Sequence, residues 1–265
     1  MSTEVYLSTD LHTLQPIILK KFERSSIQDQ AHIAFSLWKH VRGALTNLLA
    51  PDILEFDVSH QLSEFIPGGD LYIVEERLDS IEVPLIRYVI KNILFQIEVL
   101  MEQGLVHSDV KPGNIVLLPS NDQGLIVTMI DFDFMQPLRN PSHLPFGTPY
   151  FMSPEALDGE PSSTSDAFSL AMTALDLLNP PNLAACGIED NEQDLSRRRY
   201  YDWPFSHAKN ELQKQLLRCT PHYESEIHGL LNFVFSCLKL DPLKRPQSAK
   251  EMRDILMDTG NLVAV

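Results

Sequence analysis

The chain has 265 residues, with 21 Lys or Arg against 36 Asp or Glu, which gives a formal net charge of −15 at pH 7. An acidic chain of this kind lacks the broad basic field that attracts nucleic acid, so we expect no nucleic-acid partner. Hydrophobic residues make up 44% and charged residues 22% of the chain, which is ordinary for a globular protein and excludes wholesale disorder.

The N-terminal quarter of the sequence predicts strands and one helix. Residues 5–22 contain two short apolar runs around a polar turn, a pattern typical of paired strands. Between residues 25 and 49, apolar side chains recur at helical spacing. Residues 53–65 are mixed and indicate extended structure, and they run into Pro67-Gly68-Gly69, which predicts a flexible joint.

The rest of the chain is predicted to be mainly helical. Pro84 and Gly104 bracket a long helix, because proline suits the first helical turn and glycine the residue after the last. Residues 105–135 hold short apolar segments separated by turns, which indicates short strands. Further helical stretches are predicted at 164–178, 208–219, 224–238 and 247–258. We therefore predict an α+β fold, with a small strand-containing part, a break near residues 64–70 and a larger helical part.

The densest cluster of chemically useful side chains lies in the middle of the chain. Asp109, Lys111 and Asn114 fall within six residues on a turn-rich loop, and Asp131 follows a predicted strand. Carboxylate and amide oxygens suit Mg²⁺, an ammonium neutralises phosphate, and a further carboxylate can position an attacking hydroxyl. The alternative is a solvated turn that carries these residue types by chance.

The segment 107–114 resembles the catalytic-loop signature of the eukaryotic protein kinase superfamily, and Asp131-Phe132-Asp133 is similar to its metal-binding Asp-Phe-Gly. The similarity extends along the chain in the order of the family's motifs, at 64–71, 147–155, 165–170 and 241–246. The resemblance implies one two-lobe kinase domain over residues 1–265. Residues 1–63 would form part of the small lobe, 64–70 the hinge and 71–265 the large lobe.

The resemblance also implies a serine/threonine-type protein kinase that uses ATP and Mg²⁺ and acts on a serine or threonine hydroxyl of a protein substrate. Asp109 would orient that hydroxyl, and Lys111 would contact the γ-phosphate. Asn114 and Asp131 would hold magnesium beside the nucleotide, and Lys20 would contact the α- and β-phosphates. The other residues implied to bind the nucleotide are Val5, Ile18, Glu64, Ile66 and Val116.

Structural roles follow from the same resemblance. Glu155 and Arg245 would form an ion pair in the large lobe, and Asp166 would brace the backbone of the catalytic loop. Thr148 would line the substrate-binding loop. A lone histidine beside a carboxylate also suggests a catalytic base, but we interpret His107 as a packed core residue.

Four departures separate the chain from the family pattern. No Gly-x-Gly-x-x-Gly precedes Val5, so we expect the first strand and the phosphate-covering loop to be absent. Val41 stands where a helix should present a glutamate to Lys20, which would leave Lys20 free to point elsewhere. Ser108 replaces an arginine, which suggests that activity is not gated by a phosphorylated activation loop. Asp133 replaces a glycine, which restricts the backbone and adds negative charge beside the metal.

Two functions stay open from the sequence. The first is an active kinase, favoured because all four groups of the central cluster are present. The second is a pseudokinase or truncated kinase that serves as a non-catalytic binding scaffold, favoured by the missing glycine-rich loop, Val41 and Asp133. The role of Lys20 is also open, because Lys20 and Lys21 match an ordinary exposed pair at a strand edge.

The three cysteines, Cys186, Cys219 and Cys237, match no zinc motif, and their odd number fits a reduced cytoplasmic or nuclear protein. The first ten residues do not resemble a signal peptide, and the most apolar window, 230–240, is too short to cross a bilayer. We therefore expect no membrane partner. In the segment between Asp131 and Glu155, Ser142 is the candidate phosphorylation site.

Overall fold

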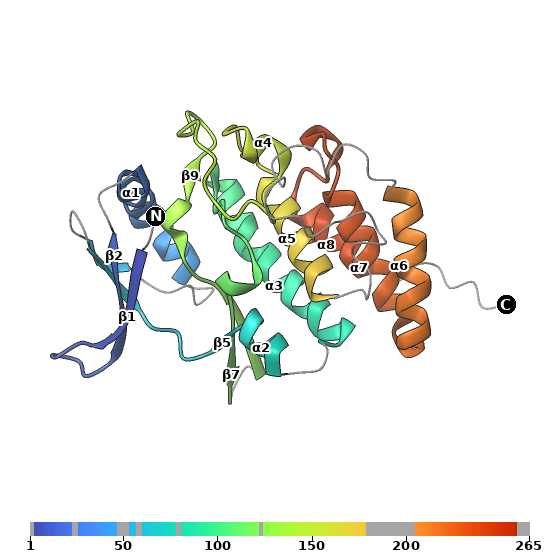
Figure 1. The fold of residues 1–265 in the computed structure, drawn as a ribbon, viewed down its shortest axis with the longest axis horizontal. Coiled ribbons are helices and arrows are strands. Elements are labelled where there is room, and N and C mark those ends of the chain that lie inside the picture. Colours follow the sequence, from blue (N-terminus) through green and yellow to red (C-terminus); the bar gives the residue numbers. More distant parts are fainter. Residues whose placement is uncertain are drawn as a thin grey trace.

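The structure is a computed structural model that describes residues 3–22, 26–46, 53–56, 60–77, 81–121, 124–178 and 205–258. Its described part is mixed α+β, with a sheet and one helix at one end and a larger group of helices at the other (Figure 1). Cys186 lies outside the described residues. Cys219 is exposed and Cys237 is buried, and both are free thiols.

The N-terminal sheet is antiparallel, with the strand order β1-β2-β4-β3. Its strands are β1 (Thr3–Thr9), β2 (Pro16–Phe22), β3 (Ile53–Phe56) and β4 (His60–Glu64). Lys20 lies on β2, where Val5 of β1 is its partner on one side and Gln61 of β4 on the other. The alternative that placed Lys20 at a strand edge is therefore wrong, because β2 is flanked by strands on both sides.

The helix predicted between residues 25 and 49 is α1 (Ser26–Thr46). It contacts the larger part of the protein mainly through apolar side chains. Trp38 is fully buried, with its ring centroid 4.7 Å from that of Phe132. Val41 is also buried and belongs to the main hydrophobic core. At the position where the family pattern has a glutamate, α1 therefore contributes apolar packing and no charge.

The larger part is organised around α3 (Val83–Glu102), whose buried side chains recur at helical spacing. The helices of the larger part that pack against α3 in Figure 1 are α5 (Ser165–Leu177), α7 (Glu224–Cys237) and α8 (Ala249–Met257). The helix α6 (Phe205–Cys219) packs on the far side of α7. These helices confirm the predicted helical stretches to within a few residues. No helix in the described ranges combines the length and the apolar character that a bilayer crossing requires.

Short strands belong to the start of the larger part, as the turn-rich segment 105–135 predicted. One sheet has the order β5-β7-β8, with β5 (Gly69–Asp70), β7 (Ile115–Ser120) and β8 (Gly124–Met129). A second pairs β6 (Leu105–Val106) with β9 (Gln136–Pro137). Two short helices, α2 (Leu71–Arg77) and α4 (Pro154–Leu157), were not predicted.

The joint between the two parts depends on Gly68. A side chain there would collide with the backbone oxygen of Leu117 and with the side chain of Val116, both on β7. Only glycine lets the segment after β4 pass this close to β7. The predicted flexible joint is thus a close-packed crossing, which fixes how the N-terminal sheet meets the larger part.

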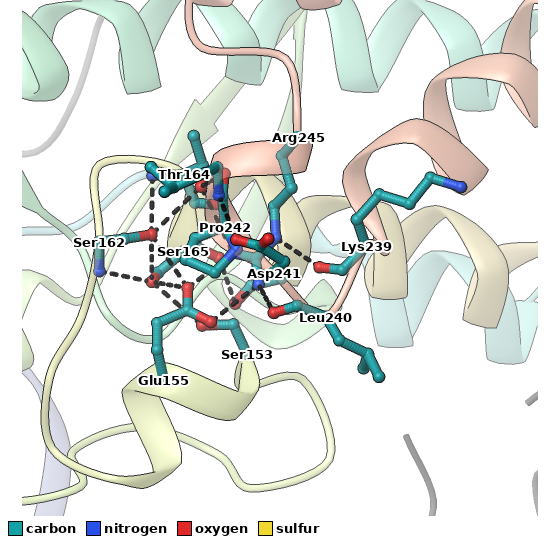
Figure 2. Close-up of polar contacts among 12 residues, drawn as sticks. Ser153, Glu155, Ser162, Thr164, Ser165, Lys239, Leu240, Asp241, Pro242 and Arg245 are labelled. Atoms are coloured by element: carbon teal, nitrogen blue, oxygen red, sulfur yellow. Dashed lines mark hydrogen bonds and ion pairs between the residues drawn. The ribbon is translucent and has the colours of Figure 1, made fainter. Parts of the chain in front are cut away.

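The predicted ion pair between Glu155 and Arg245 is present (Figure 2). Two guanidinium nitrogens meet the two carboxylate oxygens, with Nη1–Oε1 at 2.6 Å and Nη2–Oε2 at 2.8 Å. The Arg245 side chain is fully buried, and its Nε donates to the backbone oxygen of Lys239 at 2.7 Å. Ser165 Oγ donates to Glu155 Oε1, also at 2.7 Å. This bidentate pair ties α4 and the N-terminus of α5 to the segment before α8.

We predict that Arg245→Met destabilises the protein by about 3–5 kcal/mol, because it leaves the Glu155 carboxylate without its cation in a largely buried site. Urea denaturation followed by circular dichroism measures the change. The matched control is Lys250→Met, since Lys250 pairs with Asp254 at 2.9 Å but is largely exposed. That variant should change the free energy of unfolding by about 0.5 kcal/mol or less. Equal losses in the two variants would contradict the role given to Arg245.

Candidate active site

A pocket of about 360 Å³ lies between the N-terminal sheet and the start of the larger part. Its walls come from β1, β2 and β4, from the joint after β4, and from β7 and the segments around it. All residues that the resemblance implies for nucleotide binding line this pocket: Val5, Ile18, Lys20, Glu64, Ile66, Asn114, Val116 and Asp131. The fold therefore gathers them from distant parts of the sequence, and their binding of a nucleotide stays a prediction.

The lining side chains are divided by chemistry. Ile18 from β2 and Val116 from β7 are apolar, and they line the pocket from the N-terminal sheet and from the larger part of the protein, respectively. Lys20, Asn114 and Asp131 supply an ammonium, an amide and a carboxylate. Apolar walls suit a planar base, and a few converging polar groups suit phosphates and a cation, which is the composition expected of a small-molecule site.

Lys20 is held by two carboxylates. Its Nζ lies 2.6 Å from Asp131 Oδ1 and 2.8 Å from Asp133 Oδ2. The expectation that Lys20 is free to point elsewhere is therefore wrong, because anions of the segment after β8 hold it in place of a helix glutamate. Its neighbour Lys21 differs, since its side chain is 52% exposed and pairs with Glu4 on the surface.

The charges of these three groups depend on one another. Burial alone lowers the pKa of Lys20, but the two nearby carboxylates outweigh it and the pKa is raised. Burial raises the pKa of Asp131, yet the attraction of Lys20 is larger and the net pKa is lowered. For Asp133 burial prevails over Lys20, and the negative charge of Asp131 adds to it, so its pKa is raised. Lys20 thus stays an ammonium and Asp131 an anion at neutral pH.

The backbone between the two carboxylates is fixed by packing. Asp131 has a left-handed conformation with φ of 65°, and the 3₁₀ helix η2 (Phe132–Phe134) follows it. The Phe132 ring lies between two rings, with centroids 4.7 Å from Trp38 and 4.7 Å from His107. His107 is fully buried, which confirms that it is a core residue. Asp133 occupies the middle of η2, so the extra carboxylate points from a rigid turn.

Asp109 is the centre of a second network, on the loop after β6. Its Oδ1 accepts a hydrogen bond from Thr148 Oγ1 at 2.7 Å. Its Oδ2 accepts from Lys111 Nζ at 2.7 Å and from Asn114 Nδ2 at 2.9 Å. Lys111 Nζ also donates to Thr148 Oγ1 at 2.8 Å. The carboxylate is therefore buried, oriented by three side chains and placed beside an ammonium.

The backbone of this loop is braced by the side chain of Asp166, as the resemblance implied. Asp166 accepts hydrogen bonds from the backbone nitrogens of His107 at 2.7 Å and Ser108 at 3.0 Å. The brace is needed because Ser108 has a positive φ of 71°, a strained conformation for a residue with a side chain. Gly147 packs so closely on the Ser108 carbonyl oxygen that a Cβ could not fit there.

Gln136 was missed by sequence analysis, although it joins the loop to the following segment. It is buried on β9, and its Nε2 donates to Ser108 Oγ at 3.1 Å. Its Oε1 accepts from Ser142 Oγ at 3.2 Å. An uncharged chain of hydrogen bonds therefore runs from Ser108 to the candidate phosphorylation site. The position of Gln136 shortly after Asp131-Phe132-Asp133 is the signal in the sequence that could have marked it. Its partners, Ser108 and Ser142, are set by tertiary contacts.

Asn114 and Asp131, the predicted magnesium ligands, both line the pocket. Asn114 Nδ2 donates to the backbone oxygen and to Oδ2 of Asp109, so its amide oxygen is the end suited to a cation. Among the described residues, no group of three or more His, Cys, Asp or Glu is arranged to hold a metal. The donors present are hard oxygens of the kind Mg²⁺ prefers, with phosphate oxygens needed to complete the coordination.

A family model described as a protein kinase domain matches residues 2–256. The chain belongs to the protein kinase family. Its N-terminal sheet with α1 is accordingly the small lobe of a two-lobe kinase fold, and the part built around α3 is the large lobe. The family uses ATP and Mg²⁺ and acts on proteins, which agrees with the donor set of the pocket.

Several similar proteins are themselves named as kinases. The probable serine/threonine-protein kinase mkcF of Dictyostelium discoideum is 26% identical over 236 residues, covering 82% of this chain and 32% of that protein. The probable serine/threonine-protein kinase mkcD from the same organism is 30% identical over 217 residues, covering 76% of this chain and 29% of that protein. Mitogen-activated protein kinase kinase kinase 3 of Arabidopsis thaliana is 27% identical over 183 residues, covering 64% and 27%. The chain spans about a third or less of these relatives.

We predict that Gln136→Leu loosens the segment from Asp131 to Glu155, the activation segment of this kinase domain, because Ser108 and Ser142 lose their buried partner. The expected cost is about 1–3 kcal/mol of stability, the range for leaving buried polar groups without hydrogen bonds. Limited proteolysis with mass spectrometry should show faster cleavage between residues 136 and 148. The same substitution at an exposed site, Gln103→Leu, is the control. Equal cleavage in both variants would contradict an anchoring role for Gln136.

Proposed function

We propose that this chain is an active protein kinase domain that transfers the γ-phosphate of ATP to a serine or threonine hydroxyl of a protein substrate. The observation that supports this most is the environment of Asp109. A buried carboxylate that accepts from three side chains, one of them the Lys111 ammonium, is oriented for chemistry. Such a network is costly to bury, and the backbone of the same loop is braced separately by Asp166.

In the proposed reaction, Asp109 orients the substrate hydroxyl and receives its proton as the new oxygen–phosphorus bond forms. The bond between the γ-phosphorus and the bridging oxygen breaks, and ADP keeps the electron pair. Lys111 lies 2.7 Å from Asp109, so its positive charge is placed to stabilise the transferring phosphoryl group. Thr148 connects both residues to the segment on which the substrate would rest.

The nucleotide would lie in the pocket with its base between the apolar walls and its phosphates toward Lys20. Asn114 and Asp131 would hold Mg²⁺, and when bound the ion supplies neutralisation of the phosphate charge. Two observations support serine or threonine as the acceptor. Lys111 in the catalytic loop resembles the serine/threonine branch of the family, and the similar proteins mkcF and mkcD are named as serine/threonine kinases.

A second candidate is a non-catalytic scaffold with the kinase fold. The contact between Lys20 and Asp131, at 2.6 Å, favours it, because the predicted phosphate and metal ligands neutralise each other in this arrangement. Val41 also offers no charge that would draw Lys20 away. The intact network around Asp109 supports the enzyme instead, because it orients a carboxylate beside an ammonium as phosphate transfer requires.

We predict that Asp109→Asn lowers the rate of phosphate transfer by about 10²–10⁴-fold and leaves ATP binding unchanged, because Asp109 lies outside the pocket lining. Transfer is measured with radiolabelled ATP and a generic protein substrate, and binding by calorimetry. The matched control, Asp254→Asn, removes an exposed carboxylate and should leave both unchanged. Retained turnover in Asp109→Asn would refute the role of Asp109. A wild-type protein that binds ATP but transfers nothing would favour the scaffold.

A further inference from the structure

The two carboxylates that hold Lys20 occupy different places. Asp131 lines the pocket, and its side chain is 36% exposed. Asp133 is not among the lining residues, and its side chain is only 9% exposed. A ligand in the pocket can therefore reach Asp131 but not Asp133. Lys20 therefore has one partner that a ligand can reach, Asp131, and one that the pocket wall hides from the ligand, Asp133.

The hidden carboxylate belongs to a turn that cannot easily move. Phe132, directly before Asp133, is packed between Trp38 of α1 and His107 of the catalytic loop. Two residues after Asp133, the backbone oxygen of Met135 accepts a hydrogen bond from Gln30 Nε2 of α1 at 3.0 Å. Asp133 is thus fixed from both sides along the chain, which gives its carboxylate a defined position relative to β2.

Asp133 and Lys20 each compensate the buried charge of the other. Asp133 Oδ2 contacts Lys20, but its Oδ1 is buried with no hydrogen-bond partner in the described chain. A carboxylate in such a site is compensated chiefly by its cation. Lys20 in turn is buried on a central strand, and α1 carries no Asp or Glu after Asp29 that could pair with it. The departure at Val41 and the departure at Asp133 are therefore complementary.

We propose that Asp133 is the positioning residue for Lys20 and keeps its ammonium aimed into the pocket when Mg²⁺ and the nucleotide phosphates engage Asp131. Asp133 thereby does from the segment after β8 what a glutamate on α1 would otherwise do. It touches neither the nucleotide nor the substrate. The nucleotide part of this proposal rests on the proposed function, whereas the pairing of Asp133 with Lys20 can be tested without any ligand.

The pairing is tested by a double-mutant cycle on stability in the absence of nucleotide. Asp133→Asn should lower the urea midpoint of the wild-type protein but raise that of Lys20→Met, where the carboxylate has lost its cation. Asp254→Asn, the exposed control, should shift both backgrounds equally. If Lys20→Met does not fold, Lys20→Gln replaces it, because glutamine keeps donors without the charge. The same shift in both backgrounds would overturn the pairing.

The positioning role is tested by calorimetry with ATP and Mg²⁺ on the same variants. Asp133→Asn should weaken binding about tenfold in the wild-type background, as expected for a misplaced charge-assisted contact. In the Lys20→Met background it should change binding by about twofold or less, because there is no ammonium left to position. A merely structural role, or direct metal binding by Asp133, would weaken binding in both backgrounds and overturn the proposal.

Failure of this inference and failure of the proposed function give different results. If the wild-type protein does not bind ATP with Mg²⁺, the proposed function is refuted and the positioning of Lys20 for a nucleotide falls with it. The stability cycle then still shows whether Asp133 pairs with Lys20. If the wild type binds ATP and transfers phosphate but Asp133→Asn binds as tightly, only the inference is refuted.

Discussion

A buried ammonium on the small lobe, Lys20, meets two carboxylates that follow β8, and the geometry of the pocket depends on this contact. Burying an ammonium costs several kcal/mol unless anions compensate it. The position of Lys20 is set by a central strand, and that of Asp133 by a turn packed between two aromatic rings. The contact therefore joins two rigid elements and fixes the distance between the sheet and the turn after β8.

The catalytic loop is held by charged and by uncharged interactions. The buried pair of Glu155 and Arg245 joins α4 to the segment before α8, and Asp166 fixes the backbone of the loop. Toward the activation segment the link is uncharged, through Gln136 to Ser142. A neutral link of this kind does not require a phosphate to form.

The sequence predicted the long elements well, because helices such as α3 bury one face and carry proline and glycine at their ends. It missed α2 and α4, which are too short to show a helical period. The central cluster was found because Asp109 and Asn114 are close in sequence. The position of Lys20 was predicted wrongly, because Lys20 and Asp133 lie far apart in the sequence and meet only in the folded chain. Their compensation depends on tertiary placement, as do the partners of Gln136.

The pocket is proposed to bind a magnesium-bound nucleotide through Asp131. Thermal unfolding with ATP, in the presence and absence of Mg²⁺, tests this most directly, because a ligand that binds only the folded state raises the melting temperature. We expect ATP to stabilise the wild-type protein only when Mg²⁺ is present, and Asp131→Asn to abolish this shift. No shift in the wild type, or the same shift in Asp131→Asn, would contradict it.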